Sequence, residues 1–410
     1  MRSVIFYSFL LALFGGIASS GAILTSWSDA TTEFAVDLYK SICSSDSVDN
    51  LIYSPLSTAL ILGMVQLGAR GTARQQLREA LKLYGTEESK ELSGFKTLFS
   101  AISDKNKEST FTLASALYLQ DGFRVKEEYL HSNKDFFQSD IKLVNFQHAK
   151  TAAETINAWV ERKTHGKIQN LISSEDVGAL TKLVLVNAIY FRGEWKYKFR
   201  TENTNLMEFT EKYGSVTKIP TMHLQLRTKI GSFSDKNVSY QVLELPYKGE
   251  AISLILVLPA ESVTIEEMEK VITADLIKAC IFEMEEEDVE VSLPRFKIEH
   301  KLDLKKSLHM LNVTEIFNHG CDLSGITEPA DIYVSNVVQK VSIEINEDGS
   351  EAAASTGMDI SAMSMVRYQF VANRPFMFII KENLLGSILF MGKLTNPGTK
   401  PARGRDMDSL

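Results

Sequence analysis

The 410-residue sequence has only three cysteines, Cys43, Cys280 and Cys321, which lie far apart and show no metal-ligand spacing. A disulfide framework therefore does not hold this fold together, and the odd number leaves at least one free thiol or a bond to another molecule. There are only nine prolines, and no Pro/Gly/Ser-rich linker, repeat or low-complexity tract divides the chain. The composition, 44% hydrophobic and 23% charged, is that of a globular protein able to bury a large core.

An excess of positive charge is also absent, because the formal net charge is −8 at pH 7. This net charge argues against nucleic acid as a partner, although it does not exclude a basic patch on part of the surface. Beyond the N-terminus, no stretch approaches about 18 consecutive apolar residues, the length that a membrane span needs. We therefore expect a soluble mature protein that does not insert into a membrane.

The first 22 residues have the pattern of a secretory signal peptide. Arg2 supplies a positive start, residues 4–14 an apolar run, and residues 18–20 a small-residue cleavage context. A buried N-terminal helix is the alternative interpretation. Export predicts a secreted, extracellular protein, and two glycosylation acceptors agree with it, Asn237-Val-Ser239 and Asn312-Val-Thr314. Burial of either asparagine would argue against its use.

Signatures of catalysis and metal binding are missing as well. None of the seven histidines lies in an HExxH motif, and there is no GxSxG elbow, GxGxxG loop or Walker loop. The acidic run at residues 283–288 favours a solvated helix end or turn over a cation site. We predict no enzyme activity, cofactor or metal, with a triad assembled only in three dimensions as the open alternative.

Helical patterns crowd the first half of the chain and strand patterns the second. Ser54 can cap and Pro55 can open a helix over 54–69, and further helices are predicted at 151–164 and 302–311. Strands are predicted at 183–191, 242–245, 252–258, 289–293, 337–345, 376–380 and 388–391. The strands at 242–245 and 252–258, separated by a turn at 247–250, are predicted to form a hairpin. This arrangement indicates an α+β fold with large mixed sheets.

The most informative stretch is the small-residue segment that runs from residue 347 to residue 364, after a predicted strand. Read with period two, one face holds Ser350, Ala352, Ala354, Thr356, Met358 and Ile360. The other face holds both acids, Glu351 and Asp359. Small residues and Gly357 make the segment poor as a permanent strand, and Gly349 permits a sharp backbone change at its start. The pattern predicts a loop that can become a strand, with a plain Ala/Ser linker as the alternative.

Motifs elsewhere resemble the serpin family over nearly the whole mature length. They follow in family order: Asn50-Leu-Ile-Tyr-Ser-Pro-Leu-Ser57, Gly68-Ala-Arg-Gly-Thr72, Val186-Asn-Ala-Ile-Tyr-Phe-Arg-Gly-Glu-Trp195, Leu293-Pro-Arg-Phe296, Asp322-Leu-Ser-Gly325, Asn373-Arg-Pro-Phe376 and Phe390-Met-Gly-Lys-Leu-Thr-Asn-Pro397. The details most resemble the neuroserpin and pancpin branch. The resemblance implies one serpin domain at 23–397, between the signal peptide and a tail at 398–410. It also implies three β-sheets, eight or nine helices and an exposed reactive-centre loop at about 349–372.

The function implied by this resemblance is inhibition of serine proteases by a suicide substrate. The protease cleaves the loop, stays attached as an acyl-enzyme, and is trapped when the loop inserts into the main sheet. Counting along the family's loop places the scissile bond at Met363–Ser364, to within one residue. Methionine suits the hydrophobic primary pocket of a chymotrypsin- or elastase-like protease, whereas Arg367 would suit a trypsin-like one. The expected partner is such a protease, bound covalently to a monomeric inhibitor.

The resemblance also assigns two groups of residues. The hinge of the loop comprises Glu347, Gly349, Ser350, Ala352, Ala353, Ala354 and Ser355. The region where the sheet opens comprises Ser54, Ser57, Asn187, Trp195 and Gln339. Gln339 stands where many serpins carry a histidine. Because an amide can also donate and accept hydrogen bonds, we expect altered stability and retained function.

Two alternatives within the family stay open. A serpin without inhibitory activity, serving as a carrier, chaperone or storage protein, would share most of these motifs, although the small-residue hinge argues against it. A polyanion-regulated inhibitor would use Lys96, Lys105 and Lys107. Three spread lysines fit ordinary surface charge better.

Overall fold

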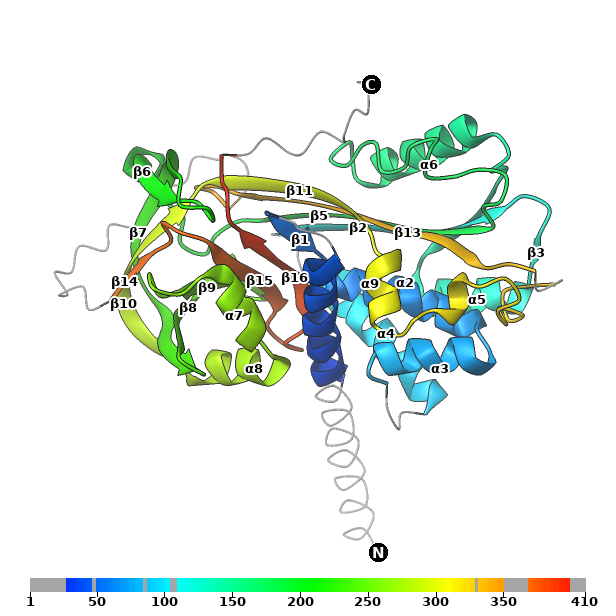
Figure 1. The fold of residues 1–410 in the computed structure, drawn as a ribbon, viewed down its shortest axis with the longest axis horizontal. Helices are drawn as coiled ribbons and strands as arrows, with labels where there is room; N and C mark the ends of the chain where they lie inside the picture. The colour runs from blue at the N-terminus through cyan, green and yellow to red at the C-terminus, as the bar shows by residue number, and fades with distance from the viewer. Residues whose placement is uncertain are drawn as a thin grey trace, which may run out of the picture.

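The computed structural model describes residues 27–45, 49–83, 87–103, 109–328, 331–349 and 368–398. Figure 1 shows a helix over residues 27–45 standing between two halves of the molecule, one rich in strands and one rich in helices. The described residues form three sheets and mixed helices, so the predicted α+β class is confirmed. No helix in these ranges combines the length and hydropathy needed to cross a membrane.

In the described part of the chain, eight α-helices follow the helix over residues 27–45. They are α2 (Pro55–Gly68), α3 (Gly71–Ala80), α4 (Glu88–Ser103), α5 (Glu127–Phe137), α6 (Ala149–Lys163), α7 (Ile265–Val271), α8 (Ala274–Glu283) and α9 (Lys305–Met310). Helix α2 begins as predicted, because the Ser54 side chain accepts a hydrogen bond from the Ser57 N–H at 3.3 Å and Pro55 occupies the first turn. It is buried on nearly all sides and lies under the five-stranded sheet.

The largest sheet has nine strands. They are β1 (Leu51–Tyr53), β6 (Asn205–Thr210), β7 (Val216–Asp235), β8 (Val238–Pro246), β9 (Ile252–Pro259), β10 (Glu285–Pro294), β14 (Tyr368–Val371), β15 (Phe376–Glu382) and β16 (Ile388–Leu394). The order is β1-β16-β15-β9-β8-β7-β10-β14, and β6 pairs with β7. The predicted hairpin is confirmed as β8 and β9. A two-stranded sheet joins β3 (Arg124–Val125) to β12 (Thr327–Glu328).

The five-stranded sheet has the order β11-β13-β5-β2-β4. Its strands are β2 (Ser109–Gln120), β4 (Asp140–Val144), β5 (Leu183–Gly193), β11 (Phe296–Asp303) and β13 (Val334–Ile345). The main core packs under its inner face, and a second apolar cluster lies between its outer face and α6. A strand covered on both faces explains why Asn187 is the only polar residue between Leu183 and Ile189 of β5.

Two local predictions were wrong. Leu302 and Asp303, expected in a helix, belong to β11, where they pair with Gln339 and Val338, and α9 starts only at Lys305. Ladder hydrogen bonds to β13 outweigh the local helical pattern there. The acidic run, expected as a helix end or turn, starts strand β10 from Glu285 onward. Glu286 and Asp288 lie opposite the basic residues Lys229 and Arg227 of β7, and the Arg227 and Glu286 side chains are 3.7 Å apart.

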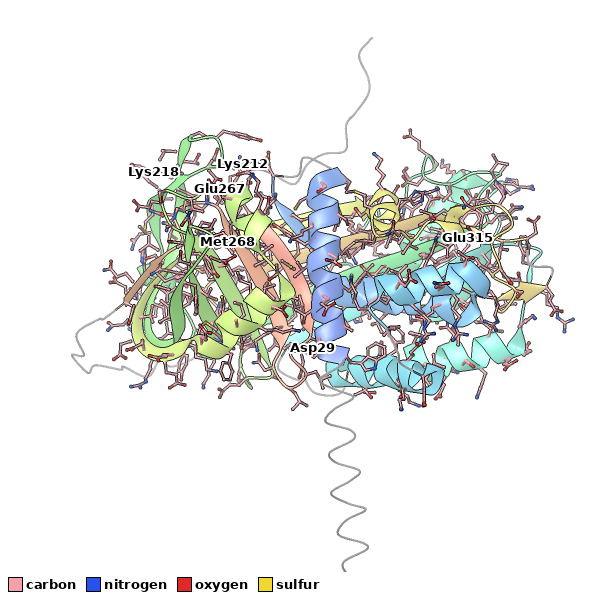
Figure 2. The ribbon with its side chains drawn as sticks, turned by 60° about the horizontal axis from the view of Figure 1, so that its bottom comes forward. Asp29, Lys212, Lys218, Glu267, Met268 and Glu315 are labelled. Carbon is pink, nitrogen blue, oxygen red and sulfur yellow. The ribbon has the colours of Figure 1, made fainter. Side chains whose placement is uncertain are left out.

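Charged side chains lie mainly on the outside of both halves. In Figure 2, Lys212 and Lys218 project at the β6–β7 end of the molecule, and Asp29 lies on the helix over residues 27–45. Asp29 pairs with Lys278 at 2.6 Å, and Lys212 pairs with Glu266 at 2.9 Å. Opposite charges are therefore interspersed at both places.

Candidate functional site

The seam between β5 and β13, at the centre of the five-stranded sheet, is where most of the described candidate residues meet. The two strands are parallel neighbours, paired from Val334 opposite Leu183 to Ile343 opposite Phe191. In this register Gln339 lies opposite Asn187. Figure 1 shows the two strands running side by side through the middle of the molecule, above α2. Strand β13 leads directly into the segment expected to be the reactive-centre loop.

Gln339 holds the inner face of the seam to the N-terminus of α2. Its Oε1 accepts from the Ser54 N–H at 2.8 Å, and its Nε2 donates to the Ser54 carbonyl oxygen at 3.0 Å. Nε2 also lies 3.2 Å from Ser57 Oγ and 2.9 Å from Thr58 Oγ1. Gln339 is fully buried, so these bonds replace water that the amide cannot reach.

Asn187 makes the corresponding connection from β5. Its Nδ2 donates to the Ser57 carbonyl oxygen at 2.9 Å and to Ser115 Oγ at 3.3 Å. Its Oδ1 is buried and has no hydrogen-bond partner among the described residues. The structure thus joins four of the five predicted sheet-opening residues in one buried network and adds Thr58 and Ser115. No sequence pattern identifies these two, because ordinary buried hydroxyls carry no motif.

Trp195, the fifth residue, lies at the end of the seam where β13 finishes. Its Nε1 donates to the Asn346 carbonyl oxygen at 2.8 Å, and its backbone N–H donates to the Asp348 carbonyl oxygen at 3.1 Å. The indole stacks on the Tyr247 ring, with centroids 4.4 Å apart and planes 10° from parallel. Burial raises the pKa of Tyr247 far above its ordinary value, so its phenol stays protonated. Trp195 therefore bonds to the start of the predicted hinge and not to the Gln339 network.

Glu347, the first residue of the predicted hinge, is held at the same place. Its Oε1 accepts from Thr204 Oγ1 at 2.8 Å and lies 3.6 Å from Arg295 Nη1. Its backbone oxygen accepts from the Phe199 N–H at 3.0 Å. A side chain that is only 10% exposed is thus fixed by a hydroxyl and a cation from distant parts of the chain.

Glycine is the only residue type that fits at position 349. Its φ is +89°, a region that L side chains rarely adopt. A Cβ there would clash with the Gly193 carbonyl oxygen and lie 2.6 Å from the Trp195 amide nitrogen. The predicted sharp backbone change at this glycine is therefore present.

The rest of the predicted loop lies outside the described residues. This applies to Ser350, Ala352, Ala353, Ala354, Ser355, Met363, Ser364 and Arg367, and also to the predicted signal peptide and nearly all of the predicted tail. The chain re-enters the described structure at β14, which pairs in parallel with β10 from Tyr368 opposite Val289.

The two glycosylation acceptors are accessible in the folded protein. Asn237 lies with Lys236 in the two-residue turn between β7 and β8, and both have positive φ. Asn312 follows α9, also with positive φ. Both asparagines are exposed, so burial does not argue against either acceptor.

The three cysteines are all free thiols. Burial raises the pKa of Cys43 to about 12 and that of Cys321 to about 11, and it also raises the pKa of Cys280. Protonated thiols are poor nucleophiles, so none has the electrostatic setting of a reactive cysteine.

The described residues contain no group of three or more side chains that could hold a metal ion. A serine and a histidine do meet, since Ser292 Oγ and His223 Nδ1 are 2.9 Å apart on β10 and β7. No carboxylate bonds to His223 among the described residues, so this pair lacks the third member of a triad.

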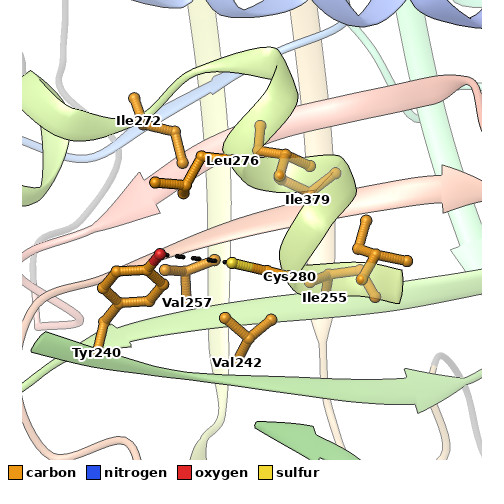
Figure 3. A pocket seen from close by; sticks show the side chains of 10 residues that line it. Tyr240, Val242, Ile255, Val257, Ile272, Leu276, Cys280 and Ile379 are labelled. Carbon is orange, nitrogen blue, oxygen red and sulfur yellow. Dashed lines mark hydrogen bonds between the residues drawn. The ribbon is translucent and has the colours of Figure 1, made fainter. Parts of the chain in front are cut away.

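Figure 3 shows a small apolar cavity between α8 and the strands of the nine-stranded sheet. Its volume is about 10 Å³, and Tyr240 Oη lies 3.4 Å from Cys280 Sγ at its wall. A cavity of this size holds at most about one water molecule. It offers no room for an organic ligand in this conformation.

Comparison with known proteins agrees with this architecture. The family model described as serpin (serine protease inhibitor) matches residues 29–397. Human Serpin I2 is 57% identical over 411 residues, covering 100% of both chains, and mouse Neuroserpin is 37% identical over 387 residues, covering 93% of this chain and 94% of the relative. The crystal structure of native protease nexin-1 with heparin superimposes with a TM-score of 0.83 at 33% identity, covering 91% of this chain and 100% of that one.

The chain belongs to the serpin family of serine protease inhibitors. Within the family, the two relatives above place it in the neuroserpin-like branch, which confirms the resemblance found in its motifs. Serpins inhibit proteases and are not enzymes themselves, in agreement with the predicted lack of catalysis.

Proposed function

We propose that this protein is a secreted suicide-substrate inhibitor of serine proteases whose loop, after cleavage, inserts between β5 and β13. The observation that carries the proposal is the parallel pairing of β5 and β13, with the loop leaving from the end of β13. A chain that turns back at Gly349 runs antiparallel to both strands. Insertion would then replace one parallel ladder with two antiparallel ones, which pair slightly better per residue.

The residues of the loop fit such an insertion. Glu347 and Gly349 fix where the chain leaves the sheet, and the residues from Ser350 to Ser355 are small apart from Glu351. Small side chains can enter between packed strands without displacing the cores on the two faces. The alternation assigns Ser350, Ala352 and Ala354 to one face and the acids to the other.

The buried network at α2 would then restrain opening of the seam. Ser54, Ser57, Asn187 and Gln339 connect both strands to the same helix end, so separating β5 from β13 requires some of these bonds to break. Gln339 donates and accepts as the histidine of many serpins would. We therefore expect this chain to keep a functional opening region without a titratable group at that position.

The chemistry of inhibition belongs to the protease. Its serine oxygen forms an ester with the Met363 carbonyl carbon, and the Met363–Ser364 bond breaks. The Ser364 nitrogen takes a proton from the protease's histidine and leaves as a new N-terminus. Methionine at this position supports a target with a hydrophobic primary pocket, of chymotrypsin or elastase type, with Arg367 as the alternative cleavage point for a trypsin-like target.

The test is incubation of the purified protein with trypsin, chymotrypsin and elastase-type proteases. We expect complexes that survive denaturing electrophoresis, and a released C-terminal peptide that begins at Ser364. Ala354→Arg, on the face expected to be buried once the loop has inserted, should turn the inhibitor into a substrate. Ala353→Arg, on the opposite face, is the matched control and should still form complexes. Cleavage without complex at every protease ratio would instead support a serpin without inhibitory activity.

Oxidation tests the assignment of Met363 separately. Methionine sulfoxide is polar and should fit a hydrophobic pocket poorly, so peroxide treatment should slow inhibition. A Met363→Leu variant should inhibit at a similar rate before and after peroxide. Equal loss of rate in both proteins would exclude Met363 as the sensitive residue.

Secretion and glycosylation are part of the same proposal. Expression of the full chain in a eukaryotic secretory host should release protein that lacks residues 1–22 and loses mass on glycosidase treatment. Substitution of Asn237 or Asn312 by Gln should each remove one increment of mass. Protein retained inside the cells would contradict the assignment of the signal peptide.

Polyanion regulation has less support. The solved relative named above was crystallised with heparin. Here, Lys96 pairs with Asp135 at 2.9 Å, which offsets its charge, and Lys105 and Lys107 lie outside the described residues. We expect heparin to change the inhibition rate little.

A further inference from the structure

The chain contains two Asp-Gly pairs, Asp121-Gly122 and Asp348-Gly349, and no Asn-Gly pair. An aspartate followed by glycine isomerises readily, because glycine has no side chain to hinder attack of its own nitrogen on the aspartate carboxyl. The first pair follows β2 and the second follows β13. Since β2 runs antiparallel to β5 and β13 runs parallel to it, the two pairs lie at opposite ends of the five-stranded sheet.

The isomerisation of such a pair needs no enzyme and no oxidant. The glycine nitrogen forms a bond to Cγ of the protonated aspartate carboxyl, and its proton leaves with the carboxyl hydroxyl as water. This closes a five-membered succinimide ring. A second water then adds to one ring carbonyl and breaks the bond from that carbonyl to the nitrogen. When it adds to the main-chain carbonyl, the chain continues through Cγ as isoaspartate, with one extra carbon in the main chain and an unchanged mass.

The turn at Asp121-Gly122 already brings the two reacting groups together. The Gly122 N–H donates to Asp121 Oδ1 at 2.9 Å, so the attacking nitrogen faces the carboxyl group. Both residues are exposed, and Gly122 has a φ of +98°. Nothing lies within 4 Å of the position that a Cβ on Gly122 would take, so the turn has room to close the ring.

At Asp348-Gly349 the same two groups are bonded elsewhere. The Gly349 N–H donates to the Asn346 carbonyl oxygen at 3.1 Å, and Asp348 Oδ1 lies 3.6 Å from Lys198 Nζ. The Asp348 carbonyl oxygen also accepts from the Trp195 N–H at 3.1 Å. Ring closure would require the nitrogen and the carboxyl group to turn toward each other, so several of these contacts must break first.

We propose that this protein forms isoaspartate at Asp121, in the turn between β2 and β3, while the contacts of Asp348 protect the predicted hinge from the same reaction. The product at residue 121 is an isoaspartyl peptide, the class of substrate that protein isoaspartate methyltransferases recognise. At residue 348, the extra main-chain carbon would disturb the alternation of the residues that follow. The value of this protection rests on the proposed function, whereas the difference between the two pairs does not.

The first experiment ages the purified protein at neutral pH and body temperature, once folded and once in urea. A purified isoaspartate methyltransferase with labelled S-adenosylmethionine measures the isoaspartate, and peptide mapping locates it. Residue 121 should react at similar rates in both samples. Residue 348 should react at least about tenfold more slowly in the folded protein than in urea, the factor that corresponds to about one net hydrogen bond.

The second experiment compares variants of the folded protein. Asp121→Glu would have to close a less favourable six-membered ring, so it should lose most of the label, and Asp348→Glu is the matched control that should keep it. Lys198→Met removes the ion pair at the hinge and should speed the reaction of residue 348 about threefold. Lys196→Met is its control, because Lys196 pairs with Glu250 at 2.8 Å instead.

Two results would overturn the proposal. One is isoaspartate at residue 348 of the folded protein at the rate found in urea, and the other is reaction of residue 121 in urea alone. Failure of the proposed function gives a different result. The two residues would then react at the expected rates, but no variant or parent protein would form a complex with a protease.

Discussion

Replacement of Gln339 by leucine tests how far the buried network holds the seam closed. The leucine side chain fills a similar volume but cannot form hydrogen bonds. The Ser54 N–H, which donates to Gln339 Oε1 at 2.8 Å, would become a buried donor without a partner. The Ser54 carbonyl oxygen would still accept from Thr58 Oγ1 at 2.9 Å, so losing its bond from Gln339 costs less than leaving the Ser54 N–H unpaired. An unpaired buried donor costs about 1–3 kcal/mol, and the lost amide bonds add about 1 kcal/mol, so we expect about 3 kcal/mol of destabilisation.

The assay is thermal unfolding followed by circular dichroism. The unfolding entropy is about 2.1 cal/mol/K per residue, so for a domain of this size 3 kcal/mol corresponds to about 4 °C. The lower stability should be accompanied by faster annealing of a synthetic peptide with the sequence of residues 350–363, because the bonds that Gln339→Leu removes restrain the seam. Gln75→Leu is the control, since Gln75 lies at the surface of α3 and its side chain bonds to no described residue other than Glu79. An unchanged unfolding temperature in Gln339→Leu would refute the reasoning that this network restrains β5 and β13.

Three other predictions concern the hinge and the thiols. Glu347→Lys places a second cation beside Arg295, so it should lower stability by about 2 kcal/mol and speed multimer formation on native gels. Adding Arg295→Glu should recover part of the lost stability. No recovery would argue against an ion pair between residues 347 and 295. Gly349→Ala should lower the free energy of unfolding, measured with denaturant, by at least about 2 kcal/mol. Gly320→Ala should cost clearly less, because Gly320 has a similar φ but open space where a Cβ would lie. Equal costs would show that the backbone angle alone matters. At pH 8 the three thiols should stay protonated and react with a thiol reagent only on unfolding, since burial raises each pKa; a fast-reacting thiol in the native protein would contradict this.

Local features of the fold were predictable from the sequence because they depend on neighbouring residues. Ser54 and Pro55 mark the start of α2, and the long apolar run, interrupted by Asn187, marks β5 as a strand covered on both faces. The turn between β8 and β9 was equally visible. Leu302 shows where this approach fails, since its helical pattern gave way to pairing with Gln339 of β13.

The candidate site was only partly predictable for the same reason. The motifs named Gln339, Asn187 and Trp195, but they did not separate the inner network from the hinge anchor. Partners such as Ser115 and Thr204 carry no motif, and they become relevant only because folding brings them to Asn187 and Glu347. Gly349 was predicted as a turn, whereas its close approach to Gly193 appears only in three dimensions.

By itself, the sequence determined the class of this protein and the character of its loop, because helix caps, apolar runs and small-residue alternation are local and follow the periods of helices and strands. Only the tertiary structure decided what holds the seam. Gln339 bonds to Ser54 from 285 positions away, and Asn187 bonds to Ser57 from 130 positions away. Such bonds depend on the register of β13 against β5 and on the faces that this register gives to neighbouring side chains, which no local pattern specifies.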